Sequence, residues 1–242
     1  MNKKEIESIK YYVKLHIDLH GNYCSWEDIG RDVLKNGYTE NGDYSEIMEE
    51  VETQYRIIER ESKEYGLFVG RCQPFTNGHN AIIQKIIRNG KIPIMILGSI
   101  DKINEKNPLS FEDRKKVIKK VYPVSGIKFI GLEDKNNWNK WFDNVEKSIS
   151  DLKINKKQIT LYAHNKEIDN KNFEHNGKQY IESSYTEIFK DAGYTIKPID
   201  EVIDKTGDVI HASDIRNDEY IAKRNLDARV YRVLKDKYGW WK

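Results

Sequence analysis

Residues 66–83, GLFVGRCQPFTNGHNAII, join an apolar run to a turn-forming stretch and then to a helix-like segment. The apolar run ends at Gly70, which permits another molecule to approach the backbone closely. His79 stands in the first turn of the predicted helix, where unsatisfied N–H groups and the positive end of the helix dipole favour an anion. The pattern indicates a phosphate site. A histidine at a helix start is also commonly a solvated residue, and this interpretation stays open.

The composition limits the class of protein. The chain has 242 residues, enough for one α/β domain and a smaller appendage. Its 41 Lys and Arg against 39 Asp and Glu leave a formal net charge of +2, which argues against a dedicated nucleic-acid-binding protein. Cys24 and Cys72 match no zinc or redox spacing, and no apolar run reaches about 18 residues. We therefore expect a soluble, cytoplasmic protein without a membrane partner.

Short apolar runs alternate with helix-like stretches from residue 64 onward. We predict strands at 66–70, 92–98, 127–131, 158–163 and 195–199, and helices at 78–89, 110–121, 138–152, 183–191 and 225–238. Unbroken apolar strands separated by helices are typical of a parallel sheet covered on both faces. The expected fold is therefore α/β, a Rossmann-like doubly wound parallel sheet of about five strands, with its site at the carboxyl ends of the strands.

Residues 1–63 show helical periodicity instead of this alternation. Ile6, Ile9 and Val13 recur every three or four positions, and Ser25 precedes an acidic first turn in the manner of an N-cap. We expect a small helical N-terminal extension at 1–63, whose role the sequence leaves open, and a second domain at 64–242.

The string GRCQPFTNGH, residues 70–79, resembles the GRFQPF-[HT]-x-G-H signature of the HxGH nucleotidyltransferase superfamily. It is most similar to nicotinamide mononucleotide adenylyltransferases of the archaeal type and to the related domain of bacterial and phage enzymes fused to Nudix hydrolases. The resemblance implies that Thr76 and His79 flank the triphosphate of ATP. The ATP-binding residues that it implies in this string are Gly70, Arg71, Gln73, Gly78 and His79.

The segment NPLSFEDR, residues 107–114, resembles the family's N/D-P-F-[TS]-x-x-E-R segment after the second strand. Independently of the family, Ser110 is a predicted N-cap with Asp113 three residues further on. The family places a basic residue just before this segment, on the nucleotide phosphates, and Lys106 occupies that position. A solvated loop lysine is the competing interpretation.

The stretch NNWNKWFDNV, residues 136–145, resembles the part in which the family supplies a tryptophan to the nicotinamide ring. Spacing favours Trp141 over Trp138, and stacking on an indole contributes about 0.5–1.5 kcal/mol beyond burial. The alternative is that both tryptophans cover the hydrophobic core. In YAHNKEID, the resemblance implies that His164 and Lys166 face the nicotinamide nucleotide at the end of the fourth strand.

The segment HASDIR, residues 211–216, resembles the family's [IS]-[SN]-[GA]-T-x-I-R motif, which binds phosphate at the start of a late helix. Ser213 keeps the hydroxyl of the usual threonine. Arg216 keeps the guanidinium, which can bind several phosphate oxygens at once. His211 departs from the pattern.

The resemblance spans residues 64–242 and implies a nucleotidyltransferase domain there. The implied reaction transfers AMP from ATP to nicotinamide mononucleotide and yields NAD and pyrophosphate. Its implied catalytic residues are His79, Thr76, Arg216 and Lys106, which would position two polyanions and neutralise charge rather than act as a strong base. Mg²⁺ would be held mainly through the ATP phosphates, so no protein metal ligands are expected.

Two alternatives stay open. One is another nucleotidyltransferase of the superfamily, with a different phosphate acceptor or with CTP. The other is a regulatory module that senses NAD or ATP without turnover. Relatives form symmetric assemblies, which favours a homo-oligomer without choosing its order. The preference between nicotinamide and nicotinic acid mononucleotide is left open as well.

Overall fold

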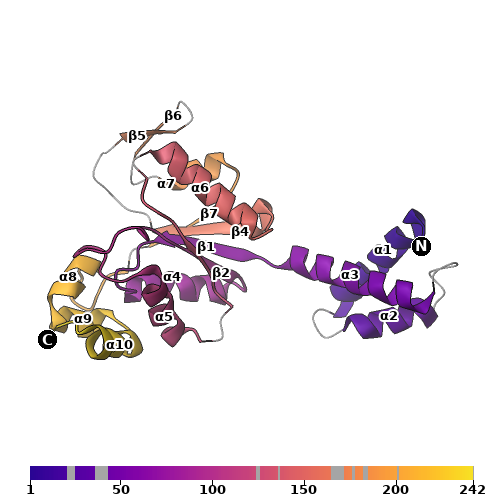
Figure 1. Cartoon of the computed structure of the whole chain (residues 1–242), viewed down its shortest axis with the longest axis horizontal. Coiled ribbons are helices and arrows are strands. Elements are labelled where there is room, and N and C mark those ends of the chain that lie inside the picture. The colour runs from indigo at the N-terminus through magenta and orange to yellow at the C-terminus, as the bar shows by residue number, and fades with distance from the viewer. Residues whose placement is uncertain are drawn as a thin grey trace. The chain divides into compact units, whose positions relative to one another are not determined.

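The computed structural model describes most of the chain, and Figure 1 shows its elements. The residues that it leaves undescribed are 21–24, 36–42, 124–125, 136, 165–171, 176–177, 182–184, 201 and 242. At 19–20, 138, 172–175, 178–181 and 185 the backbone alone is described. The chain divides into two compact units, Met1–Lys63 and Glu64–Lys242, each with its own core.

The first unit consists of three helices. They are α1 (Lys3–His20), α2 (Trp26–Lys35) and α3 (Tyr44–Ser62). Their small core is made of Ile9, Tyr12, Val13, Ile29, Val33, Ile47, Val51 and Ile58. The core residues of α1 recur at the helical spacing seen in the sequence, because one face of the helix is buried. The Asp43 side chain caps α3 by accepting the N–H of Glu46 at 3.0 Å.

The second unit is built on a five-stranded parallel sheet. Its strands are β1 (Tyr65–Gly70), β2 (Ile92–Leu97), β3 (Lys128–Gly131), β4 (Ile159–His164) and β7 (Thr195–Ile199), in the order β3-β2-β1-β4-β7. The register pairs Gly70 with Leu97 and Leu97 with Gly131, so these three strands end at one level. The strand order reverses at β1, between β2 and β4, where sheets of this kind bind ligands. The predicted Rossmann-like fold is confirmed.

Helices cover both faces of this sheet (Figure 1). One core holds residues of α6 (Trp138–Asp151) and α7 (Tyr185–Asp191), and the other holds residues of α4 (Asn77–Arg88), α5 (Phe111–Val121) and α10 (Ala228–Tyr238). Successive strand residues alternate between the two cores: Leu67 belongs to the first and Phe68 to the second. Burial on both faces explains why β1, β2 and β4 are largely unbroken apolar runs in the sequence.

Further elements lie outside the predicted strand and helix ranges. A separate antiparallel hairpin joins β5 (Asn172–His175) to β6 (Lys178–Ile181). Two short helices, α8 (Ala212–Asn217) and α9 (Glu219–Asn225), precede α10, which begins later than the predicted start at 225. Asp227 caps α10 and explains this start, since its carboxylate accepts the N–H of Arg229 at 2.9 Å. Within the described ranges, no helix combines the length and the apolar character needed to cross a membrane.

Candidate functional site

Helix α4 begins with a capping box made by Thr76 and His79. The Thr76 hydroxyl oxygen accepts the N–H of His79 at 3.4 Å, and Nδ1 of His79 accepts the N–H of Thr76 at 3.0 Å. Because Nδ1 accepts from an amide, the neutral ring carries its proton on Nε2. The ring also lies 6.0 Å, centroid to centroid, from the ring of Phe75 and nearly parallel to it. A histidine with an Nε2–H donor is thus fixed at the positive end of α4.

Gly70 is the last residue of β1, the strand that precedes α4. A Cβ added at Gly70 would lie 2.6 Å from the tip of the Phe68 ring. The Phe68 ring in turn lies 5.7 Å from the His79 ring. The glycine was predicted to admit a ligand. The structure adds a packing reason, because a larger residue would displace the phenylalanine that contacts the histidine.

Two buried side chains tie the loop after β1 to the segments that follow β2. The Gln73 amide donates to the carbonyl of Leu109 at 2.8 Å and accepts the N–H of Leu109 at 3.0 Å. Nη1 of Arg114 donates to the carbonyls of Arg71 at 2.8 Å and Gly98 at 2.7 Å. These buried contacts fix the conformation of the loop after β1. The described contacts of the Gln73 side chain are therefore structural, and its contact with ATP stays a prediction.

Arg114 was not among the predicted site residues, although it closes the NPLSFEDR segment. It is 1% exposed, and within the described part of the chain its Nη2 has no hydrogen-bond partner. Burial lowers the pKa of this guanidinium. A buried cation that donates to three carbonyls, those of Ser110, Arg71 and Gly98, adds positive potential near the ends of β1 and β2.

Arg216 reaches the same loop from α8. Its Nη1 donates to the carbonyl of Gln73 at 2.5 Å. Burial lowers the pKa of Arg216, and the nearby cation of Arg71 lowers it further, while Asp214 opposes this. The Arg71 side chain is exposed. The guanidiniums of Arg71 and Arg216 repel each other near the start of α4. A bound polyanion would relieve this repulsion.

The other predicted residues lie at varied distances from this centre. Ser213 is exposed on α8, and its hydroxyl donates to Asp214 at 3.1 Å. Lys106 is exposed in a turn, where its backbone N–H donates to the side chain of Asn104 at 3.0 Å. Gly78 is buried in the first turn of α4. Within the described part of the chain, no hydrogen bond or ion pair joins Lys106 to His79 or Arg216, so its part in the site stays a prediction.

The residues predicted to hold the nicotinamide nucleotide are only partly described. Trp141 lies on α6, half-buried, with its ring edge-on to that of Phe189 at 6.4 Å. His164 ends β4, and its Nδ1 lies 3.1 Å from the carbonyl oxygen of Asp200. Trp138 opens α6, but its side chain is not described, and Lys166 lies outside the described residues. The Phe189 contact agrees with the core-covering alternative, and stacking of Trp141 on nicotinamide stays a prediction.

The matching family model spans most of the second unit. Residues 67–230 match the model described as cytidylyltransferase-like. The chain belongs to the cytidylyltransferase-like family. This match includes the loop after β1, helix α4 and the 211–216 segment, and therefore the segments that carry Arg71, His79 and Arg216.

Two curated relatives of this cytidylyltransferase-like chain carry informative names. It is 30% identical over 108 residues to the nicotinamide/nicotinic acid mononucleotide adenylyltransferase of Acinetobacter baylyi, covering 43% of this chain and 57% of that protein. It is 35% identical over 81 residues to the nicotinamide-nucleotide adenylyltransferase of Methanolobus tindarius, covering 32% of this chain and 47% of that protein. The chain thus spans about half the length of these relatives. The resemblance that the motifs predicted is confirmed.

A solved structure shows the same fold. The bifunctional NMN adenylyltransferase/ADP ribose pyrophosphatase of Francisella tularensis superposes with a TM-score of 0.55 at 22% identity, covering 72% of this chain and 51% of that one. At this identity the likeness supports the cytidylyltransferase-like fold and leaves the chemistry to the residues.

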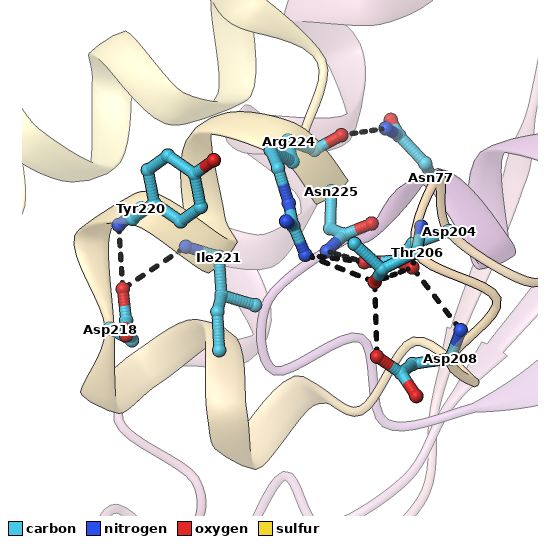
Figure 2. A network of polar contacts seen from close by, with 9 residues as sticks. All are labelled: Asn77, Asp204, Thr206, Asp208, Asp218, Tyr220, Ile221, Arg224 and Asn225. Carbon is cyan, nitrogen blue, oxygen red and sulfur yellow. Dashed lines mark hydrogen bonds and ion pairs between the residues drawn. The ribbon is translucent and has the colours of Figure 1, made fainter.

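A polar network that sequence reasoning missed lies beside the start of α4 (Figure 2). It joins Asp204 and Thr206 of a turn to Arg224 and Asn225 of α9, and the carbonyl of Arg224 accepts from Asn77 of α4. A cavity of about 350 Å³ borders the network. Among the described residues, no group of three His, Cys, Asp or Glu side chains is arranged to hold a metal ion.

Proposed function

We propose that the chain transfers AMP from ATP to nicotinamide mononucleotide and releases pyrophosphate, forming NAD. The observation that carries the proposal is the fixed His79 at the start of α4, with Arg216 hydrogen-bonded to the adjoining loop. Both lie at the ligand-binding edge of a doubly wound sheet. The names of the two curated relatives support a pyridine mononucleotide as the acceptor.

The reaction follows from what these residues can bind. An oxygen of the mononucleotide 5′-phosphate attacks the α-phosphorus of ATP in line, and the bond to the bridging oxygen of the leaving pyrophosphate breaks. The attacking phosphate is already an anion, so no strong general base is required. The Nε2–H of His79 and the guanidiniums of Arg71 and Arg216 stabilise the charge that shifts onto pyrophosphate. Thr76 keeps the histidine in this orientation through the capping box.

The donors of this site fit a metal ion that arrives with ATP. Arginine, histidine and backbone N–H groups bind phosphate oxygens, whereas Mg²⁺ requires oxygen ligands. We infer that Mg²⁺ is held by the ATP phosphates and water, and that when bound it neutralises phosphate charge. Lys106, Ser213, Gly70, Gly78 and Gln73 complete the proposed ATP contacts.

The nicotinamide half is assigned to the other side of the sheet reversal. We propose that His164 at the end of β4 contacts the mononucleotide and that Trp141 stacks on its ring. Trp138 and Lys166 are the remaining proposed contacts.

The test is direct synthesis by the purified full chain. The protein is incubated with MgATP and nicotinamide mononucleotide, and NAD and pyrophosphate are assayed together, with nicotinic acid mononucleotide in a parallel reaction. We expect the two products in equal amounts. Saturable ATP binding without a dinucleotide product from either acceptor would contradict the proposal and favour a sensing role, whereas turnover with CTP would indicate another nucleotidyltransferase.

A further inference from the structure

Asp204 is a buried carboxylate with an unusually complete set of donors. Its side chain is 5% exposed. One oxygen, Oδ1, accepts the N–H groups of Thr206 at 2.7 Å and Asp208 at 3.2 Å, together with the Thr206 hydroxyl. The other, Oδ2, accepts Nη2 of Arg224 at 2.7 Å and Nδ2 of Asn225 at 3.4 Å. The hydrogen bond from the Thr206 hydroxyl is the largest of the effects that hold the pKa of Asp204 well below its usual range.

The two oxygens serve different parts of the fold. Oδ1 closes the turn 204–208, which leads directly into the 211–216 segment and α8. Oδ2 holds Arg224 and Asn225 in the last turn of α9. A carboxylate offers about four lone-pair positions, so the donors around Asp204 leave none unused. One side chain thus joins the approach to α8 with the end of α9.

Helix α9 is in turn hydrogen-bonded to the start of α4. The backbone carbonyl of Arg224 accepts Nδ2 of Asn77 at 3.3 Å. Asn77 is the first residue of α4 and directly follows Thr76, the cap that holds His79. Figure 2 shows the continuous path from Asp204 through Arg224 to Asn77. The start of α4, which carries His79, and the segment that leads into α8, which carries Arg216 in its last turn, are therefore both connected to one carboxylate.

We propose that Asp204 is a positioning residue that sets the start of α4 relative to α8, and so sets His79 relative to Arg216. The inference rests on the proposed function for its kinetic consequence. We assign Asp204 no contact with either nucleotide, because protein donors occupy both of its oxygens. It acts through the link to α9, because a displacement of about 1 Å at a reacting centre can reduce the rate about 10²-fold.

Asp204→Asn tests this link with little change of shape. The asparagine oxygen can still accept the N–H groups of the turn, but its NH₂ group then faces the Arg224 guanidinium, and two donors cannot bond. Asp208→Asn is the matched control. Asp208 belongs to the same turn, and one of its carboxylate oxygens lies 3.0 Å from the Thr206 hydroxyl oxygen. Among the described residues, no hydrogen bond joins the Asp208 side chain to α9.

The kinetic prediction separates positioning from binding. Asp204→Asn should lower kcat about 10- to 10²-fold with little change in KM for ATP, since the misplaced groups act chiefly in the transition state. Arg224→Gln should lower kcat similarly, and the double variant should lose no more than the single ones. A kcat of Asp204→Asn within twofold of the wild-type value, or losses that add in the double variant, would overturn the proposal. Asp208→Asn should stay within twofold.

Amide hydrogen exchange tests the same link without any activity. Asp204→Asn should speed exchange in the first turn of α4, residues 76–80, whereas Asp208→Asn should not. Unchanged exchange there overturns the positioning role. A wild-type chain that makes no NAD contradicts the proposed function alone, because the exchange result still decides the link. Should Asp204→Asn fail to fold, Arg224→Gln takes its place, since it removes the guanidinium that bonds Oδ2 and keeps the N–H bonds of Thr206 and Asp208 to Oδ1.

Discussion

Nδ1 of His79 accepts the backbone N–H of Thr76 at 3.0 Å, so the histidine is held by the cap of its own helix. The contact fixes the ring orientation and places the proton of the neutral ring on Nε2. A ring protonated on both nitrogens could not accept this N–H. The same side chain therefore has a structural part at Nδ1 and a proposed phosphate-binding part at Nε2, and substitution can separate the two.

His79→Ala should lower kcat about 10²–10³-fold, as loss of a donor to the transition state does. His79→Gln is the sharper variant. Glutamine at this position of a capping box can accept the Thr76 N–H, but it places no donor where Nε2 stands. We expect it to unfold near the wild-type temperature and to lose NAD synthesis. Full turnover by a folded His79→Gln protein would refute the phosphate role.

Arg216→Lys should lower kcat/KM for ATP about tenfold or more, because an ammonium cannot bond the Gln73 carbonyl and phosphate oxygens with the geometry of a planar fork. Steady-state kinetics at fixed ionic strength measure the effect. Arg56→Lys is a suitable control, since Arg56 pairs with Glu52 in α3 and its side chain is 70% exposed. Equal kinetics for the two variants would remove Arg216 from the site.

Trp241→Phe should lower the unfolding free energy, because Trp241 is hydrogen-bonded to Ile215, the residue before Arg216. The indole N–H of Trp241 donates to the carbonyl of Ile215 at 2.9 Å, and the ring stacks on Tyr231 at 5.3 Å. Phenylalanine keeps the stacking and removes the donor, which should cost about 1–3 kcal/mol of unfolding free energy by leaving a carbonyl unpaired. Denaturant unfolding measures this cost. Trp240→Phe, beside it, should cost less.

Asp113 should make the unfolding free energy depend on pH in the acid range. The hydrogen bond from Ser110 lowers the pKa of Asp113, and the Tyr238 hydroxyl also donates to it at 2.7 Å. A carboxylate with a lowered folded pKa stabilises the protein above its unfolded value of about 3.9 and loses this contribution as the pH falls through the folded value. Asp113→Asn should therefore lose less unfolding free energy than the wild type between about pH 5 and pH 2. Parallel losses in urea unfolding would contradict this assignment.

The sheet could be predicted because its strands are buried on both faces, as Leu67 and Phe68 show by entering opposite cores. The β5–β6 hairpin was missed because its strands are four residues long and do not form an apolar run. The Asn176-Gly177 pair between them is the sequence signal that could have predicted it.

Contacts of the site could be predicted from the sequence where they are local, and not where they join distant segments. Thr76 and His79 lie three residues apart, so their pairing is a local property of the sequence. Arg114 bonds carbonyls of Arg71 and Gly98, and Asn77 bonds the carbonyl of Arg224. Any residue presents a carbonyl, so side chains in the sequence carry no sign of these long-range contacts.

The strand order has a consequence for folding. β1 pairs with β2 early in the unit, but its other neighbour is β4, and Tyr65 aligns with Ile159 across a long intervening chain. Such non-local pairings close large loops and form slowly. The β1–β4 pair is therefore expected to form after the β1–β2 pair, and α8 brings Arg216 from still further along the chain. During synthesis, the proposed ATP site is complete only once the segment that bears Arg216 has left the ribosome.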